Sequence, residues 1–197
     1  MNQHNPSTSR RRRIRLPGYD YSQEGLYFVT ICTKERKSLF GKIIGEEIRL
    51  NACGRIAENC WASIPFHFEN TFLHEFIVMP NHIHGVIEII NTVEARFVAL
   101  DKNLAGAMNR APTDDTNGGK GGFSEATNPM LHMNLSRIIR WYKGRTTFEC
   151  KSAQFMFAWQ RNYYEHVIRG EQDYLRIAEY IRSNPVMWKK DVYYQAE

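Results

Sequence analysis

Long apolar runs are missing from this chain of 197 residues, although 43% of its residues are hydrophobic. No stretch approaches the ~20 apolar residues of a membrane-spanning helix, and the polar, arginine-rich N-terminal segment has no signal-peptide core. We therefore expect a cytoplasmic protein without membrane association. The length suffices for one domain with a sizeable core, plus short appendages.

Paired cysteines are missing too. The chain has four cysteines without CxxC spacing, namely Cys32, Cys53, Cys60 and Cys150. Three of them lie within apolar or helical patterns, which is typical of small buried residues. The spacing therefore predicts neither disulfides nor a zinc-cysteine site.

Excess charge is absent from the body of the protein. The formal net charge is +5, and residues 1–17 contain five arginines without an acidic residue: Arg10, Arg11, Arg12, Arg13 and Arg15. The remainder of the chain is thus formally neutral. Residues 1–17 are predicted to form a disordered basic arm, which either binds nucleic acid phosphates or serves as a solubilising extension.

The regular pattern from residue 18 onward predicts strands and helices in a definite order. Strands are predicted at residues 26–33, 71–79, 82–90 and 155–168, a hairpin at 39–50, and helices at 52–63, 134–148 and 171–184. Residues 91–130, rich in glycine and polar residues, read as a long mobile insertion. We expect one domain at 18–190, then a tail at 191–197. Without the hairpin and last helix, the order is βαββαβ, which predicts a ferredoxin-like α+β fold with an antiparallel sheet.

Two histidines alternate with an isoleucine inside the strand predicted at residues 82–90. Side chains alternate along a strand, so His82 and His84 share one face, roughly 7 Å apart at Cα. Neutral imidazoles bind divalent cations well, so the pair forms half of a metal site. Two histidines satisfied by hydrogen bonds are the ordinary alternative, and a third ligand is needed to favour metal.

The last predicted helix offers that ligand and a nucleophile. Tyr180 lies off the apolar stripe of this helix, and Asn184 follows one turn later. The Asn184 amide oxygen could join the two histidines on a cation while Tyr180 stands beside it. A half-exposed tyrosine and a helix-ending asparagine are common without catalysis, and Tyr163, Tyr164 and Tyr174 are rivals by residue type.

Five blocks in this order resemble the single-tyrosine transposases with a His-hydrophobic-His motif, most closely the REP-associated tyrosine transposases. The blocks are IRLPGYDYS at 14–22, YFVTICT at 27–33, VMPNHIHG at 78–85, WQRNYYEHVIR at 159–169 and EYIRSNP at 179–185. The resemblance implies that His82, His84 and Asn184 bind Mg²⁺ or Mn²⁺ and that Tyr180 is the catalytic tyrosine. It also implies cleavage and rejoining of single-stranded DNA beside hairpins, through a 5′-phosphotyrosine intermediate.

DNA contacts are expected from two basic segments. The first is the arm with its five arginines, and the second is a basic flank of the helix predicted at 134–148, formed by Arg137, Arg140, Lys143 and Arg145. Trp159, Tyr163 and Tyr164 could stack on unpaired bases. A monomer and a homodimer are both open.

Other functions fit parts of the pattern. A non-catalytic RNA- or DNA-binding module can use a ferredoxin-like sheet with aromatic residues on its open face. That alternative lacks the expected glycine-aromatic signature on a central strand and leaves His82 and His84 unexplained. A replication initiator or plasmid relaxase shares the histidine motif, but it usually carries further domains for which this chain has no room.

Overall fold

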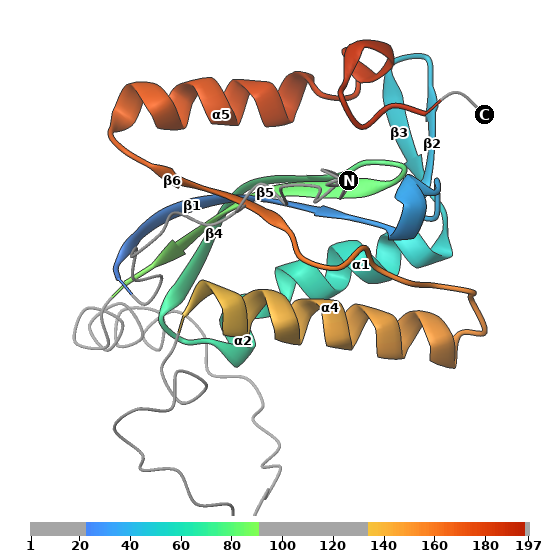
Figure 1. The fold of residues 1–197 in the computed structure, drawn as a ribbon, viewed down its shortest axis with the longest axis horizontal. Coiled ribbons are helices and arrows are strands. Elements are labelled where there is room, and N and C mark those ends of the chain that lie inside the picture. The colour runs from blue at the N-terminus through green and yellow to red at the C-terminus, as the bar shows by residue number, and fades with distance from the viewer. Residues whose placement is uncertain (1–22, 91–133, 196–197) are drawn as a thin grey trace, which may run out of the picture.

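The computed structural model describes residues 23–90 and 134–195, and Figure 1 shows their arrangement. A four-stranded antiparallel sheet has the order β4-β5-β1-β6, formed by β1 (Gly25–Cys32), β4 (Thr71–Val78), β5 (His82–Ile89) and β6 (Tyr164–Ile168). Each strand lies antiparallel to its neighbours. This strand order is that of a ferredoxin-like split βαββαβ sheet, so the predicted fold class is confirmed.

Helices α1 (Ala52–Ala62) and α4 (Leu135–Ser152) cover one face of the sheet (Figure 1). The larger hydrophobic core lies between these two helices and the sheet. It includes Ile83 of β5, Trp61 of α1 and Tyr142 of α4, all fully buried. The packing is tight at Gly85, since a Cβ there would lie 2.3 Å from the Trp61 ring. Gly85 thus lets α1 approach β5 at the strand that carries the two histidines.

Helix α5 (Glu171–Ser183) lies alone across the opposite face (Figure 1). A smaller buried cluster joins it to the sheet through Phe28 of β1, Val86 of β5, and Ile177 and Ile181 of α5. Val86 has the same parity as His82 and His84, so both histidines face the side on which α5 lies. The segment that follows α5 lies on that side too and contains a short 3₁₀ helix, η3 (Trp188–Lys190).

A separate two-stranded sheet, β2 (Gly41–Ile44) and β3 (Glu47–Leu50), forms the predicted hairpin. It is tied to the start of β5 because the Phe40 amide donates to the Pro80 carbonyl. Asn51 caps α1 as expected, through its side-chain oxygen and the Gly54 amide. A single-turn helix, α2 (Ile64–His67), was not expected, because Pro65 is compatible with the first turn of a new helix as well as with the end of the old one.

Predicted boundaries needed one substantial correction. The strand predicted at 155–168 is confined to β6, because residues 161–162 form a bend in which Asn162 has a φ of 64°. Four buried, free cysteines agree with the prediction of core residues. The basic arm at 1–17 and the whole insertion at 91–130 lie outside the described residues. No helix within the described residues is long and apolar enough to cross a bilayer.

Candidate active site

The two histidines meet on the face of β5 that looks toward α5. Both are essentially inaccessible to solvent, and their Nε2 atoms lie 2.9 Å apart. Burial lowers the pKa of His82 to about 3 and holds the pKa of His84 well below its usual range, with the neighbouring Arg36 and His82 adding to the two effects respectively. Both imidazoles are therefore neutral near pH 7, which is the form that binds metal.

Asn81 fixes the proton of His82. The Asn81 amide nitrogen donates to the carbonyls of Arg36 and Tyr193, so its oxygen, 2.8 Å from His82 Nδ1, must accept. His82 consequently carries its proton on Nδ1, and its Nε2 lone pair points at His84.

The His84 ring can take either proton arrangement. Its Nδ1 lies 2.8 Å from the Thr30 hydroxyl, which can donate or accept. When His84 carries the proton on Nε2, it donates to His82; when the proton is on Nδ1, two Nε2 lone pairs converge and a cation between them would relieve their repulsion. The hydrogen bonds to Asn81 and Thr30 are of the kind that orient metal-binding imidazoles.

A carboxylate completes a three-residue group that sequence reasoning missed. His82, His84 and Asp191 offer ligand atoms that all lie within 4.8 Å of one another. Asp191 falls in the stretch read as a C-terminal tail, and no periodic signal marked it. Its position beside the histidines depends on the turn of the chain through η3 after α5.

Asn184, the third ligand predicted from sequence, lies beside this group. Its amide nitrogen donates to Asp191 Oδ2 at 2.8 Å, and its buried Oδ1 has no hydrogen-bond partner among the described residues. An unsatisfied buried oxygen is costly and fits a site that accepts a cation. Two imidazoles, a carboxylate and an amide oxygen are suitable ligands for a divalent metal, and the mixed nitrogen and oxygen set suits Mn²⁺ better than the harder Mg²⁺.

Tyr180 reaches the histidines from α5. Its hydroxyl lies 3.1 Å from His84 Nε2 and 3.3 Å from Asp191 Oδ2, and its side chain is partly open to solvent. Burial, together with the negative charge of Asp191, raises the pKa of the Tyr180 phenol. A cation on Asp191 would offset that charge and favour the phenolate.

The rival tyrosines lie elsewhere. Tyr163 bonds to Ser136 of α4, on the other side of the sheet, and Tyr174 donates to Glu75 at the edge strand β4. Tyr164 is on β6, on the histidine face, and its ring contacts Phe28. In the described residues, Tyr180 is the tyrosine whose hydroxyl is hydrogen-bonded to the histidine pair.

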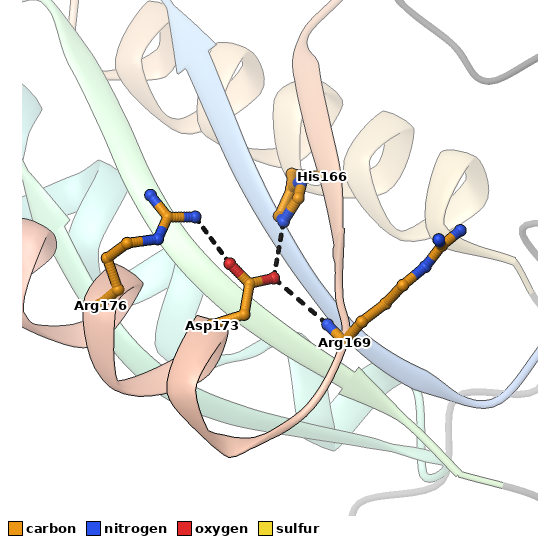
Figure 2. A network of polar contacts seen from close by, with 4 residues as sticks. All are labelled: His166, Arg169, Asp173 and Arg176. Atoms are coloured by element: carbon orange, nitrogen blue, oxygen red, sulfur yellow. Dashed lines mark hydrogen bonds and ion pairs between the residues drawn. The ribbon is translucent and has the colours of Figure 1, made fainter.

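A polar network fixes the start of α5 (Figure 2). Asp173 bonds at 2.8 Å to the His166 ring of β6, accepts the Arg169 amide, and pairs with Arg176 one turn later. The hydrogen bonds to His166 and Arg176 lower the Asp173 pKa to about 2, so the carboxylate is charged at neutral pH. His166 thus ties β6 to α5, while the preceding residue, Glu165, is buried on the opposite face of that strand.

A second contact fixes the next residue of α5. The Tyr174 hydroxyl donates to Glu75 Oε2 at 2.6 Å, where an irregularity interrupts the pairing of β4 with β5. Asp173 and Tyr174 thus bind α5 to both edge strands of the sheet. Since Tyr180 follows within two turns, these contacts hold its position over β5.

The α4 residues predicted to contact DNA are separated from this site. Arg137, Arg140, Lys143 and Arg145 lie on α4, which covers the other face of the sheet (Figure 1). Lys143 donates to the carbonyls of Gln160 and Asn162, and Arg145 pairs with Glu149. The arginines of residues 10–15 lie outside the described residues, so the DNA-binding prediction remains untested.

Comparison with known proteins supports the fold and shows the family. The chain matches no established family profile. The solved structure of a REP-associated tyrosine transposase bound to a REP hairpin aligns with a TM-score of 0.53 and 18% identity, over 88% of this chain and 74% of that one. That likeness concerns the fold alone. An uncharacterized protein of Haemophilus influenzae is 38% identical over 192 residues, which is 97% of each chain. This chain therefore belongs to the same family as the Haemophilus influenzae protein and has a fold that resembles that of the REP-associated tyrosine transposase.

Proposed function

We propose that this protein is a metal-dependent, single-tyrosine transposase of the REP-associated branch, which nicks and rejoins single-stranded DNA next to hairpins. The observation that carries the proposal is the 3.1 Å contact between the Tyr180 hydroxyl and His84 Nε2, across two elements remote in sequence. A tyrosine used only for packing does not require a hydrogen bond from its hydroxyl to a buried histidine. The five motif blocks and the transposase-like fold support the same activity.

The metal would be held by His82, His84 and Asp191, with the Asn184 oxygen close by. When bound, a divalent cation supplies Lewis-acid polarisation of a non-bridging phosphate oxygen. Asn81 and Thr30 orient the two imidazoles, and Tyr193 covers them, with its ring centroid 4.7 Å from that of His82.

Tyr180 would attack the phosphorus and form a bond from its phenolic oxygen to the 5′-phosphate, while the bond from phosphorus to the 3′-oxygen breaks and that oxygen takes a proton from solvent to become a free hydroxyl. The phenolic proton has a potential acceptor in Asp191 Oδ2, 3.3 Å away. The phosphotyrosine keeps the energy of the broken phosphodiester, so a 3′-hydroxyl of another end can reverse the step and join the strands. The reaction requires no nucleotide cofactor.

The proposed partner is single-stranded DNA that folds into hairpins, as in the neighbour that was solved with a REP hairpin. The basic arm and the α4 residues are candidates for phosphate contacts away from the reacting group. We propose the segment predicted as residues 18–190 as the catalytic domain, extended to Tyr193 so that Asp191 is included.

The decisive assay mixes the protein with labelled, hairpin-flanked single-stranded DNA and Mn²⁺ and looks for a covalent adduct on a denaturing gel. Wild type is expected to form an adduct that EDTA prevents, and Tyr180→Phe is expected to form none. Tyr164→Phe, a change on the same face of the sheet, is the matched control and should leave the adduct intact. Equal adduct from Tyr180→Phe would refute the proposal, as would its absence from wild type with every hairpin substrate.

A further inference from the structure

A groove borders the candidate active site between the β2–β3 hairpin and the segment that follows α5. Its volume is about 770 Å³, within the ~300–1,000 Å³ that is usual for small-ligand sites. One wall contains Lys42 and Glu46 of the hairpin, and the other contains residues 185–190 together with Tyr194 and Gln195. A groove of this volume has room for nucleotides of single-stranded DNA.

The charge of the groove is mostly positive. Lys42, Lys189 and Lys190 line it and are exposed, against one acidic residue, Glu46. No ion pair within residues 23–90 and 134–195 involves any of the three lysines. Cations that lack acidic partners are available to phosphate groups, and they come from both walls.

Apolar and aromatic side chains lie between these cations. Val186, Met187 and Tyr194 line the groove and remain substantially exposed, at 56%, 45% and 38% respectively. The Tyr194 ring is held edge-on against Trp188, with centroids 5.4 Å apart. Exposed aromatic rings among cations are the usual means of binding unpaired bases without sequence preference.

The groove adjoins the histidine site through Trp188. Trp188 also packs against His82, at 5.9 Å between ring centroids, so the same residue supports both the groove and the site. Lys190 directly precedes Asp191 of the candidate metal group. A single strand of DNA whose scissile phosphate lies at Tyr180 could therefore continue past η3 into the groove.

We propose that this groove binds the single-stranded DNA that adjoins the scissile phosphate, with Lys42 and Lys189 on its phosphates and Tyr194 against a base. The inference rests on the proposed function for its substrate class and adds a binding site distinct from the basic arm and from α4. It assigns a role to the hairpin, which the chemistry at Tyr180 does not use.

The test measures binding alone, so that it does not depend on cleavage. Full-length protein carrying Tyr180→Phe is titrated, in EDTA, into a fluorescent hairpin with a single-stranded flank and into the same hairpin without the flank. Anisotropy gives Kd at several salt concentrations. The variant Lys42→Ala/Lys189→Ala is compared with Arg55→Ala/Lys151→Ala, which removes two exposed cations from α1 and α4 on the other face.

Loss of two phosphate contacts should reduce the slope of log Kd against log salt by about 1.4 on the flanked hairpin, since each contact to a single strand contributes ~0.7. The slope on the hairpin without a flank, and that of the control variant, should not change. Tyr194→Leu should weaken binding of the flanked hairpin roughly 10-fold at an unchanged slope. An unchanged slope for the lysine variant would overturn the proposal, and so would an equal loss on both hairpins, which would indicate a duplex in the groove.

The two proposals can fail separately. A covalent adduct at Tyr180 without any effect of the groove variants would leave the proposed function in place and remove the groove from it. Salt-dependent binding that requires Lys42 and Lys189, in a protein that never forms an adduct, would establish the groove and refute the chemistry.

Discussion

The buried histidine pair should make the metal-free protein sensitive to mild acid. His82 has a folded-state pKa of about 3, against an ordinary value of 6.5. Between these values the unfolded chain binds a proton that the folded chain does not, so the stability of the fold decreases as the pH decreases. Each pH unit in this range costs about 1.4 kcal/mol for one such group.

The total effect is large relative to the stability of a domain. The difference between the folded-state pKa of His82 and its ordinary value corresponds to about 5 kcal/mol once the pH has fallen to the folded-state pKa. Single domains are stable by only ~5–15 kcal/mol. His84, whose pKa lies well below its usual range, adds to the effect in the same direction. We therefore expect the free energy of unfolding to fall by several kcal/mol between pH 6 and pH 4.

The variant His82→Gln isolates this contribution. Glutamine keeps a polar donor for Asn81 and does not titrate, so the slope of unfolding free energy against pH should fall by about 1.4 kcal/mol per unit between roughly pH 4.5 and 6. The free energy of unfolding at each pH is measured by urea titration in EDTA, with tryptophan fluorescence as the signal. Tyr180→Phe, which removes a hydroxyl next to the same rings, should retain the wild-type slope. If His82→Gln and wild type have parallel pH profiles, His82 is not a buried neutral imidazole and the reasoning about the metal site is wrong.

Three further predictions test the ligands, the packing and the placement of α5. Asp191→Asn should weaken Mn²⁺ binding about 10- to 100-fold by calorimetry; loss of binding with Asn184→Ala alone would instead favour the ligand predicted from sequence. Gly85→Ala should destabilise the protein by about 1–3 kcal/mol in thermal unfolding, because its Cβ would overlap the buried Trp61 ring, whereas Gly144→Ala, with open space at α4, should be neutral or stabilising. Asp173→Asn should cost roughly 1 kcal/mol and slow adduct formation, because α5 loses its link to β6; adduct formed at the wild-type rate would show that this network does not position the nucleophile.

Much of the fold could be predicted because its elements follow local rules. A run rich in β-branched and aromatic residues predicts β1, and Asn51, Pro185 and the 3.6-residue stripe of α5 delimit helices. The strand that became β6 was predicted too long, because its aromatic residues also suit an irregular segment packed on the core. Hydrophobic periodicity does not distinguish a strand from an irregular segment whose hydrogen bonds go to side chains such as Lys143.

The sequence by itself determined that His82 and His84 share a strand face and that Tyr180 and Asn184 share a helix face, since both follow from the fixed periods of strand and helix. Only the tertiary structure decided that the two faces meet, because the approach of α5 to β5 depends on contacts of Asp173 and Tyr174 with both edges of the sheet. It also brought Asp191 into the group and carried the predicted basic face of α4 to the opposite side. Such placements arise from loops and packing between distant segments, which leave no periodic trace in the chain.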